Sequence, residues 1–285
     1  MNERPDPEAV QSVFRDVTGH RAIAGIIRSH STNSRDVRRY ALEGLDLLDC
    51  RDILELGCAF GPFTETLRGR VAPEAAVTGV DIVEAYEEPF LEACGRAGLR
   101  GRFLPEGVPV IRSFPEASFD LVLCSFALYF FPEVIPGIAR ILRPGGLFVV
   151  ITHDRNNMGE LADLIRRTLT RQGDLPGGRL PVESIVARFS AENGRDLLAP
   201  WFGEVETQDY RNTLVFPPSD IPQILQYIHF KSPFLLTGTA RTVPEVTKLL
   251  EEELKRWIRS TGSIHLSKND RIFRCRQPRS RKDGT

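Results

Sequence analysis

Two acids and two glycines in the first third of the chain have the types and spacing of a small-molecule site. Residues 53–64 read ILELGCAFGPFT, so an apolar run contains an acid, Glu55, and then breaks at Gly57 and Gly61. Glycine lets the backbone approach a ligand with no side chain in between. Asp81 ends the next apolar run, where a carboxylate can accept hydrogen bonds from both hydroxyls of a ribose. The pattern predicts a pocket for a ligand that carries a free 2′-hydroxyl.

The glycine spacing differs from that of a dinucleotide-binding turn. The pattern G-x-G-x-x-G, laid from Gly57, requires glycines at positions that hold Ala59 and Pro62. Pro62 suits the first turn of a helix but supplies no N–H to a pyrophosphate. The turn therefore favours a ligand without a pyrophosphate. A nucleotide-dependent oxidoreductase, or a non-catalytic regulatory fold, stays an alternative that these two residues disfavour.

Apolar strand-like runs alternate with amphipathic segments from about residue 34 to residue 171. The strand runs are continuously apolar, as burial on both faces of a parallel sheet demands. This rhythm predicts a doubly wound α/β fold. We expect strands over 52–56, 76–81, 119–125 and 147–152. We expect helices over 34–46, 84–96 and 157–171, one that begins at about residue 62, and one that follows the strand 119–125 and ends at 143.

The C-terminal half has a different rhythm, with two more strands and a helical insertion between them. The strands are expected at 204–207 and 269–274, and the charges of the second indicate an edge strand. Helices are expected near 219–230 and 244–260. Apolar residues of the insertion are expected to line a pocket: Ile221, Ile224, Leu225, Tyr227, Ile228, Phe230 and Phe234. The expected domains are an N-terminal helical cap (1–40), a core (41–210 and 266–276), an insertion that covers the acceptor site (211–265) and a disordered tail (277–285).

Several segments resemble motifs of a known family, the class I S-adenosylmethionine-dependent methyltransferases. The resemblance covers about residues 34–153, with the motifs in the family's order and at ordinary spacings. It implies a Rossmann-like, mostly parallel seven-stranded sheet and S-adenosylmethionine as the cofactor. The matching segments are ELGCAFG at 55–61 for E/D-x-G-x-G-x-G, VDI at 80–82 for the second motif, SFDLV at 118–122 for S-F-D-x-V, and LRPGGL at 142–147 for L-x-P-G-G.

The resemblance also implies which residues bind the cofactor. Asp81 would hold the ribose, and Ile82 would pack on adenine. Ala59 replaces the middle glycine of the first motif, and its methyl group could tighten the methionine end of the pocket. The family's usual acidic contact to adenine has no counterpart at 108–113, so Glu106 or a backbone carbonyl stays open for that role. The complete predicted set is Glu55, Gly57, Cys58, Ala59, Gly61, Asp81, Ile82 and Ser125.

Methyl transfer by in-line displacement depends mainly on how the acceptor and the methyl group are positioned. A base is needed only if the acceptor starts protonated. His153 is the preferred candidate because it directly follows the fifth strand run, whereas Tyr129 and His229 are weaker candidates. A lone histidine is more often structural. No metal ligand set is expected, because no Cys or His cluster has metal-ligand spacing.

Composition limits the partners. Lys and Arg (37) nearly balance Asp and Glu (38), so no overall field recruits nucleic acid or an anionic membrane. Five dispersed cysteines are typical of reduced thiols, and the charged, proline-containing start is unlike a signal peptide, so we expect a cytoplasmic protein. We expect a methyltransferase that acts on a small-molecule acceptor, with a role in secondary metabolism as a hypothesis. A methyltransferase acting on RNA or protein is the alternative, although a basic face is missing from the sequence outside the short tail.

Overall fold

The computed structural model describes residues 6–175, 178–236, 239 and 241–279. The chain divides into two compact units, and each is assembled from segments that are far apart in the sequence. We call them the sheet unit (35–154, 188–210 and 270–285) and the helical unit (1–34, 155–187 and 211–269).

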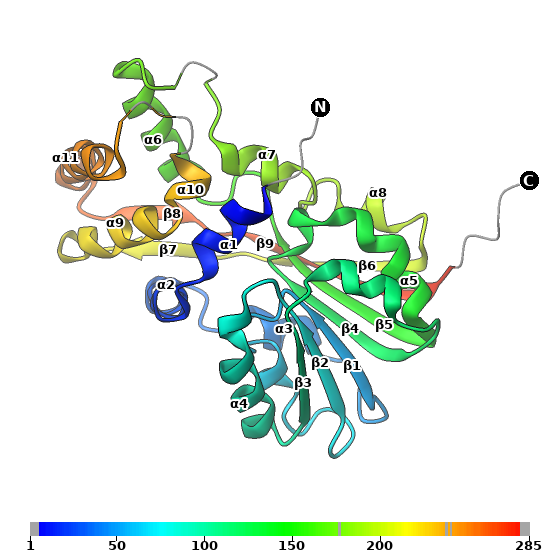
Figure 1. Cartoon of the computed structure of the whole chain (residues 1–285). Helices are drawn as coiled ribbons and strands as arrows, with labels where there is room; N and C mark the ends of the chain where they lie inside the picture. The colour runs from blue at the N-terminus through cyan, green and yellow to red at the C-terminus, as the bar shows by residue number, and fades with distance from the viewer. Residues whose placement is uncertain (1–5, 176–177, 237–238, 240, 280–285) are drawn as a thin grey trace, which may run out of the picture. The chain divides into compact units, whose positions relative to one another are not determined.

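Seven strands form the single sheet of the sheet unit, in the order β3-β2-β1-β4-β5-β9-β6 (Figure 1). The first five strands in this order pair in parallel, whereas β9 is antiparallel to both of its neighbours. This arrangement confirms the predicted mostly parallel, seven-stranded, Rossmann-like sheet. The strands are β1 (Asp52–Leu56), β2 (Ala76–Val80), β3 (Arg100–Leu104), β4 (Phe119–Ser125), β5 (Leu142–His153), β6 (Phe202–Tyr210) and β9 (Asp270–Pro278).

The helices of the sheet unit are short apart from α4, which packs along β3. Helix α3 is shorter than the expected 34–46: it begins after Asp36, whose carboxylate accepts hydrogen bonds from the N–H groups of Arg38 and Arg39, and it ends at Leu42. The α-helices are α3 (Val37–Leu42), α4 (Glu87–Ala97), α5 (Ile135–Ile141) and α8 (Gly194–Leu198), and the 3₁₀ helices are Thr64–Leu67, Glu84–Tyr86, Val108–Ser113, Leu128–Phe130 and Pro132–Val134.

The helix expected from about residue 62 is only the 3₁₀ helix Thr64–Leu67. Arg68 leaves the helical region, with a ψ of 119°, and Gly69 follows with a φ of 68°. A residue with a left-handed backbone ends a helix. The loop after β1 therefore returns to the sheet after a single turn.

The expectation that 269–274 forms an edge strand is wrong, because β9 lies between β5 and β6. Its charges find partners there. Arg274, only 8% exposed, donates hydrogen bonds to the backbone carbonyls of Ala41 and Glu43, and Arg271 pairs with Asp209. A buried cation that is hydrogen-bonded in this way is tolerated. One edge is instead β3, a strand missing from the sequence-based prediction, whose first three residues are exposed.

The helical unit has a hydrophobic core of its own, which includes Leu164, Leu214, Val246 and Leu250. Four of the residues expected to line a pocket are buried, and Ile221, Ile224 and Ile228 belong to this core, so they are packing residues. The elements are α1 (Pro7–Phe14), α2 (Val17–His30), α6 (Gly159–Arg171), α7 (Pro181–Ala187), α9 (Ile221–Phe230), α10 (Ser232–Leu235), α11 (Val243–Thr261), the 3₁₀ helix Pro218–Asp220, and the antiparallel pair β7 (Thr213–Phe216) and β8 (Ile264–Ser267).

The unit boundaries differ from the domains expected from the sequence. Residues 155–187 were assigned to the core, but they group with the helical unit. Of the expected tail, 277–278 complete β9, whereas 280–285 lie outside the described residues. No helix among the described residues is long and apolar enough to cross a membrane.

Candidate functional site

Four parallel strands of the sheet unit end beside one another and bring the predicted site residues together. We call the line formed by the carboxyl ends of these strands the carboxyl edge. Strand β1 pairs with β2 and β4, and β4 pairs with β5, so the carboxyl ends of these strands meet. Ligands of open α/β sheets bind beyond this edge. The predicted residues on it are Gly57 after β1, Asp81 after β2, Ser125 at the end of β4 and His153 at the end of β5.

The turn after β1 is an elbow of three left-handed residues. Gly57, Ala59 and Gly61 have φ angles of 66°, 46° and 81°. A Cβ on Gly57 would lie 2.6 Å from the Cβ of Ala127, and one on Gly61 would lie 2.5 Å from the Cβ of Ala93, so glycine is required at both positions by the chain's own packing. The backbone of the elbow is not covered, because Gly57 and Ala59 remain partly exposed.

Asp81 joins the elbow to the end of the second strand. Its Oδ2 accepts a hydrogen bond from the N–H of Ala59 at 3.0 Å, and its Oδ1 accepts one from the N–H of Val83 at 3.1 Å. The N–H of Ile82 is a third backbone donor to this carboxylate, and a carboxylate has about four acceptor positions, so about one remains for a ligand's hydroxyl group. Burial raises the pKa of Asp81, although the backbone donors oppose the shift. The elbow and the second motif therefore form one connected structure.

Glu55 lies beneath the elbow and is 1% exposed. Its Oε2 accepts hydrogen bonds from the backbone N–H of Thr64, at 3.1 Å, and from the Thr64 hydroxyl, at 2.5 Å. Its Oε1 is buried and has no hydrogen-bond partner. Burial raises the pKa of Glu55 to about 7, despite the Thr64 hydrogen bonds and the charge of Arg38. Oε2 thus anchors the start of the 3₁₀ helix Thr64–Leu67, whereas Oε1 has no hydrogen-bond partner within the chain.

Three other residues predicted for the cofactor have different surroundings. Cys58 is fully buried and its sulfur faces Gly79 of β2, so its side chain is a packing group. Ile82 is partly exposed and lies against Gly107, where an added Cβ would come within 2.4 Å of its side chain. Ser125 is partly exposed. Glu106, one of the candidates for the adenine contact, is exposed and precedes Gly107.

His153 belongs to an aromatic and acidic cluster at the end of β5. A hydrogen bond of 2.6 Å joins its Nδ1 to Oδ1 of Asp270, a residue that is 5% exposed. Its ring stacks on that of Phe126, with 4.6 Å between the centroids, and lies 5.9 Å from the ring of Tyr129. A carboxylate that binds one nitrogen of a histidine orients the imidazole and selects its tautomer. The alternative candidate His229 is exposed on α9 of the helical unit.

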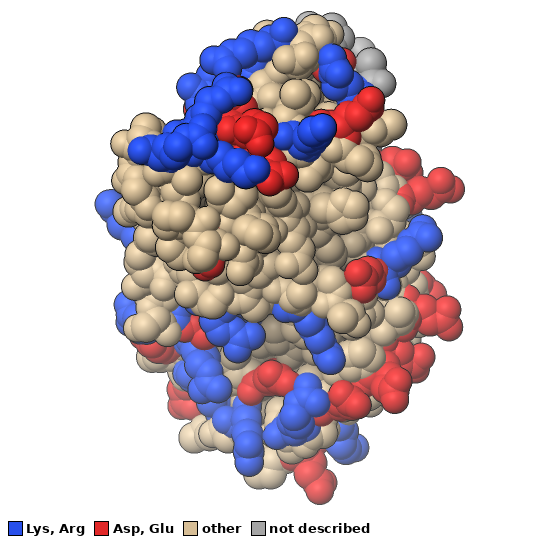
Figure 2. Space-filling view, turned by 90° about the vertical axis from the view of Figure 1, so that its left-hand side faces the viewer, with Lys and Arg blue, Asp and Glu red and all other residues tan. Residues whose placement is uncertain are grey.

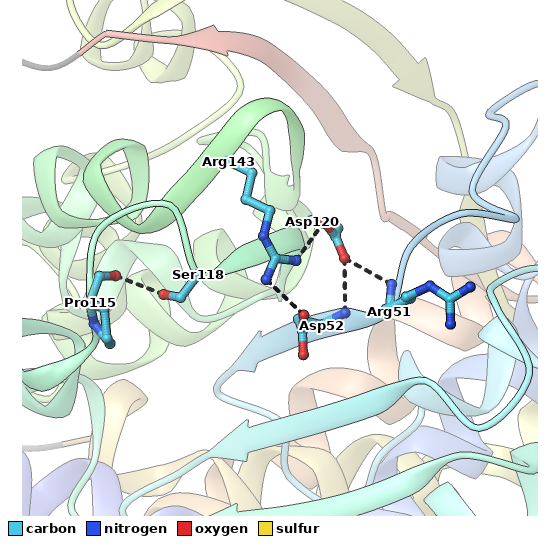
Figure 3. Close-up of polar contacts among 6 residues, drawn as sticks. All are labelled: Arg51, Asp52, Pro115, Ser118, Asp120 and Arg143. Carbon is cyan, nitrogen blue, oxygen red and sulfur yellow. Dashed lines mark hydrogen bonds and ion pairs between the residues drawn. The ribbon is translucent and has the colours of Figure 1, made fainter.

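The motif residues Asp120 and Arg143 lie at the opposite side of the sheet, where these parallel strands begin, which we call the amino edge (Figure 3). Arg143 donates to Oδ1 of Asp120 at 2.7 Å and to Oδ2 of Asp52 at 2.8 Å. The other oxygen of Asp120 accepts hydrogen bonds from the N–H groups of Arg51 and Asp52. Burial pushes the pKa of Asp120 upward, but the Asp52 N–H and the Arg143 guanidinium outweigh it, so its pKa is lowered. These motifs therefore tie β1, β4 and β5 together.

Arg38 and Asp270 are candidate site residues that sequence analysis missed, and both lie near the aromatic rings that follow β4. The guanidinium carbon of Arg38 lies 5.5 Å from the centroid of the Phe126 ring, and its Nε is buried without a hydrogen-bond partner. Phe126 follows β4 with a φ of 55°, a strained conformation for a bulky residue. No local pattern marks Arg38 or Asp270, although an aromatic cluster at 126–131 is visible in the sequence.

The cysteines are packing residues. All five are free thiols, and Cys58, Cys94, Cys124 and Cys275 are buried. Burial raises the pKa of the Cys94 thiol to about 12 and that of Cys50 to about 11, so neither is a thiolate near neutral pH.

Surface charge on one face of the molecule is mixed. In Figure 2, Lys and Arg side chains are interspersed with Asp and Glu side chains. An extended basic field, which RNA binding would favour, is not present on the face shown.

A family model described as "Methyltransferase domain" matches residues 53–146, which include the elbow, Asp81 and both motifs of the amino edge. A nocamycin O-methyltransferase from Saccharothrix syringae is 33% identical over 131 residues, which are 44% of this chain and 46% of that protein. A demethylmenaquinone methyltransferase from Deinococcus radiodurans is 29% identical over 147 residues, 50% of this chain and 60% of that protein. The chain thus spans about half the length of the curated relatives that it matches.

Solved structures share the fold at low sequence identity. A Bacillus halodurans protein covers 87% of this chain and all (100%) of its own length, with a TM-score of 0.54 and 13% identity. The [4+2]-cyclase SpnF covers 94% of this chain and 96% of its own length, with a TM-score of 0.53 and 15% identity. These two comparisons establish the architecture of the chain.

Proposed function

We propose that this chain, whose residues 53–146 form a methyltransferase domain of the class I S-adenosylmethionine-dependent family, transfers a methyl group to a small-molecule acceptor. S-adenosylmethionine is the methyl donor of this family, and S-adenosylhomocysteine is the product. The observation that carries the proposal is the carboxyl edge, where the uncovered elbow and Asp81 come from neighbouring strands and are joined by a hydrogen bond.

The carboxyl edge fits this cofactor in three respects. The elbow presents backbone without large side chains at Gly57 and Ala59. Asp81 retains acceptor capacity for a ribose hydroxyl. Glu55 holds a buried oxygen without an internal partner, which is suited to a cationic group of a ligand. When bound, the cofactor supplies an activated methyl group, and the chain's own residues need only bind and orient the reactants.

His153 is proposed as the general base for an acceptor that starts protonated. The Asp270 hydrogen bond orients its ring, and Phe126 stacks against one face. Replacement of His153 by Ala should lower single-turnover methyl transfer most strongly below the acceptor's own pKa, where deprotonation is needed. If the rate is unchanged across the pH range, His153 has no role in the mechanism.

Acceptor recognition is assigned in this proposal to segments 1–40 and 211–265, outside the matched domain. The limit of the family match at residue 146 supports this assignment, because acceptor specificity is a property in which members of one family differ. The relatives' names also support a small molecule, since one is a nocamycin O-methyltransferase and another a demethylmenaquinone methyltransferase. A role in secondary metabolism is part of the proposal.

Two measurements test the proposed function. Calorimetry with S-adenosylhomocysteine and with NAD should give binding of the first only, and binding of NAD alone would instead support an oxidoreductase. Labelled S-adenosylmethionine, incubated with the protein and a metabolite extract from the source organism, should give a labelled small molecule. Label recovered only in RNA or in protein, with retention on RNA that falls as salt rises, would overturn the small-molecule assignment.

A further inference from the structure

An ammonium group in the helical unit lies among aromatic rings. Lys231 follows α9, and its Nζ lies 4.4 Å from the centroid of the Phe14 ring. The centroids of Phe230 and Phe234 lie 5.4 and 5.7 Å from the same atom. The three rings come from α1, α9 and α10, and α10 packs against both of the other helices (Figure 1). His20 of α2 stacks on Phe230, with 5.7 Å between the ring centroids. We call these four rings the aromatic cluster.

Lys231 has no anionic partner among the residues that the structure describes. Burial lowers the pKa of its ammonium to about 7, the charge of Lys268 lowers it further, and no carboxylate opposes these effects. Attraction to aromatic faces compensates only in part for the lost hydration of a cation. Buried charges in proteins are usually paired, so an unpaired ammonium beside a second cation requires an explanation. An anion from outside the chain would supply the missing partner.

The aromatic cluster is accessible to a ligand. Phe14, Phe230 and Lys231 are each partly exposed, whereas Phe234 is 5% exposed. The rings do not belong to the hydrophobic core of the helical unit, which is built from other side chains. Aromatic faces that a core does not cover can stack on a planar molecule. The cluster therefore combines flat apolar surface with one positive charge.

Two more polar groups lie on the same face of α9 as Lys231. Gln223, Tyr227 and Lys231 are spaced four residues apart, so they form one row along the helix, about 12 Å long at 1.5 Å per residue. Oε1 of Gln223 is buried without a hydrogen-bond partner. The Tyr227 hydroxyl forms no hydrogen bond with any residue in the described ranges, and burial alone raises its pKa to about 12. Helix α9 thus presents a polar row that the chain itself leaves unpaired.

We propose that the aromatic cluster and this polar row bind the methyl acceptor, and that the acceptor is a planar, apolar ring system with an anionic oxygen. The anionic oxygen pairs with the ammonium of Lys231, and the ring system stacks on Phe14 and Phe230. The row is longer than a single benzene ring, which favours fused rings, and hydroxyl groups of the ligand would reach Tyr227 and Gln223. The inference rests on the proposed function, because it names the chemical class of the acceptor.

The test compares two probes of one shape, 2-naphthoate and its neutral amide, 2-naphthamide. At pH 6, where Lys231 is protonated, the unaltered protein should bind 2-naphthoate about 10-fold more tightly, because a charge-assisted contact forms. Lys231→Met keeps the apolar stem but removes the ammonium, so it should bind both probes equally. Lys248→Met is the matched control, because Lys248 is exposed on α11 of the same unit, and it should keep the preference. Titration calorimetry measures each dissociation constant.

A competition experiment tests whether the probe occupies the acceptor site. At a saturating concentration, 2-naphthoate should lower the yield of labelled small molecule that the unaltered protein forms from S-adenosylmethionine and the metabolite extract. At the same concentration, 2-naphthamide should lower it less. If 2-naphthoate binds and the yield is unchanged, the site is not the acceptor site and the inference is wrong.

The other outcomes also decide the question. If Lys231→Met still prefers 2-naphthoate, or if the unaltered protein shows no preference or binds neither probe, the inference is wrong. Thermal unfolding of Lys231→Met at or above the midpoint of the unaltered protein shows that folding is intact, because the variant no longer buries an unpaired cation. A missing preference in a protein that binds S-adenosylhomocysteine overturns this inference alone. If S-adenosylhomocysteine does not bind either, the proposed function is overturned as well.

Discussion

The two edges of the sheet treat their charged side chains in opposite ways. At the amino edge, Arg143 binds two carboxylates, and Asp120 accepts hydrogen bonds from two backbone N–H groups in addition. At the carboxyl edge, Glu55 and Arg38 each keep a buried atom without a partner. The first arrangement stabilises the fold by itself, whereas the second leaves two buried polar atoms without a hydrogen bond.

Backbone conformation does not follow the same division. Left-handed residues other than glycine occur at the carboxyl edge, at Ala59 and Phe126, and also at the amino edge, at Glu74 before β2 and Ala117 before β4. Residues of the segments at 55–61 and 80–82 lie at the carboxyl edge, whereas residues of the segments at 118–122 and 142–147 bind one another at the amino edge and hold the strands in register.

The largest predicted difference between the edges concerns ligand affinity. Replacement of Asp81 by Ala should weaken binding of S-adenosylhomocysteine by about 100-fold, because the carboxylate that is proposed to hold the ribose is lost. Replacement of Asp120 by Ala should leave affinity unchanged while it lowers the midpoint of thermal unfolding. Calorimetry and a thermal melt on both variants measure the two effects. Equal affinity in Asp81→Ala and the unaltered protein would remove the carboxyl edge as the binding site.

The second prediction concerns the stability effect of Glu55. Its folded-state pKa of about 7 lies above the ordinary value of 4.5, so the folded state holds a proton that the unfolded chain releases. Stability should therefore fall as pH rises from about 4.5 to about 7 and then level off. The stability of Glu55→Gln should not change with pH across this window, and at pH 8 the variant should be more stable than the unaltered protein by roughly 3 kcal/mol. Urea unfolding at several pH values measures the profile.

Glu55→Gln should nevertheless bind S-adenosylhomocysteine more weakly than the unaltered protein. A variant that gains stability and loses affinity is the signature of a buried charge kept for function. Unchanged pH dependence in Glu55→Gln would mean that another group titrates in the window.

The third and smallest prediction concerns the amino edge. Arg143→Met should destabilise the sheet unit by roughly 1 kcal/mol near pH 7, because the ion pairs are partly exposed and Asp120 keeps its backbone donors. The lowered pKa of Asp120 means that its contribution is present above the ordinary value of 3.8 and is lost as pH falls below it. The difference in unfolding free energy between Arg143→Met and the unaltered protein should therefore become smaller at acid pH. A difference that persists at low pH would show that Arg143 acts through packing.

The rule that charged residues mark an edge strand holds for β3, but the sequence analysis applied it to 269–274. Charged residues were expected to mark 269–274 as an edge, but its arginines bind backbone carbonyls and Asp209, and β9 is interior. The real edge strand β3 begins with Arg100 and Arg102, and these charges hid it from a search for apolar runs. Charged residues are tolerated in β9 because they bind residues from distant segments of the chain, and a local sequence pattern does not reveal these partners.

Local sequence alone determined four of the five parallel strands (β1, β2, β4 and β5), the elbow after β1 and Asp81 at the end of β2, because burial on both faces and a tight turn impose residue types over a few neighbouring positions. Tertiary structure decided the rest. It placed β9 between β5 and β6, grouped 155–187 with the helical unit and brought Arg38 to the edge that holds Glu55. These choices depend on contacts between residues far apart in the chain, whose hydrogen bonds and charges are satisfied only once the fold is complete.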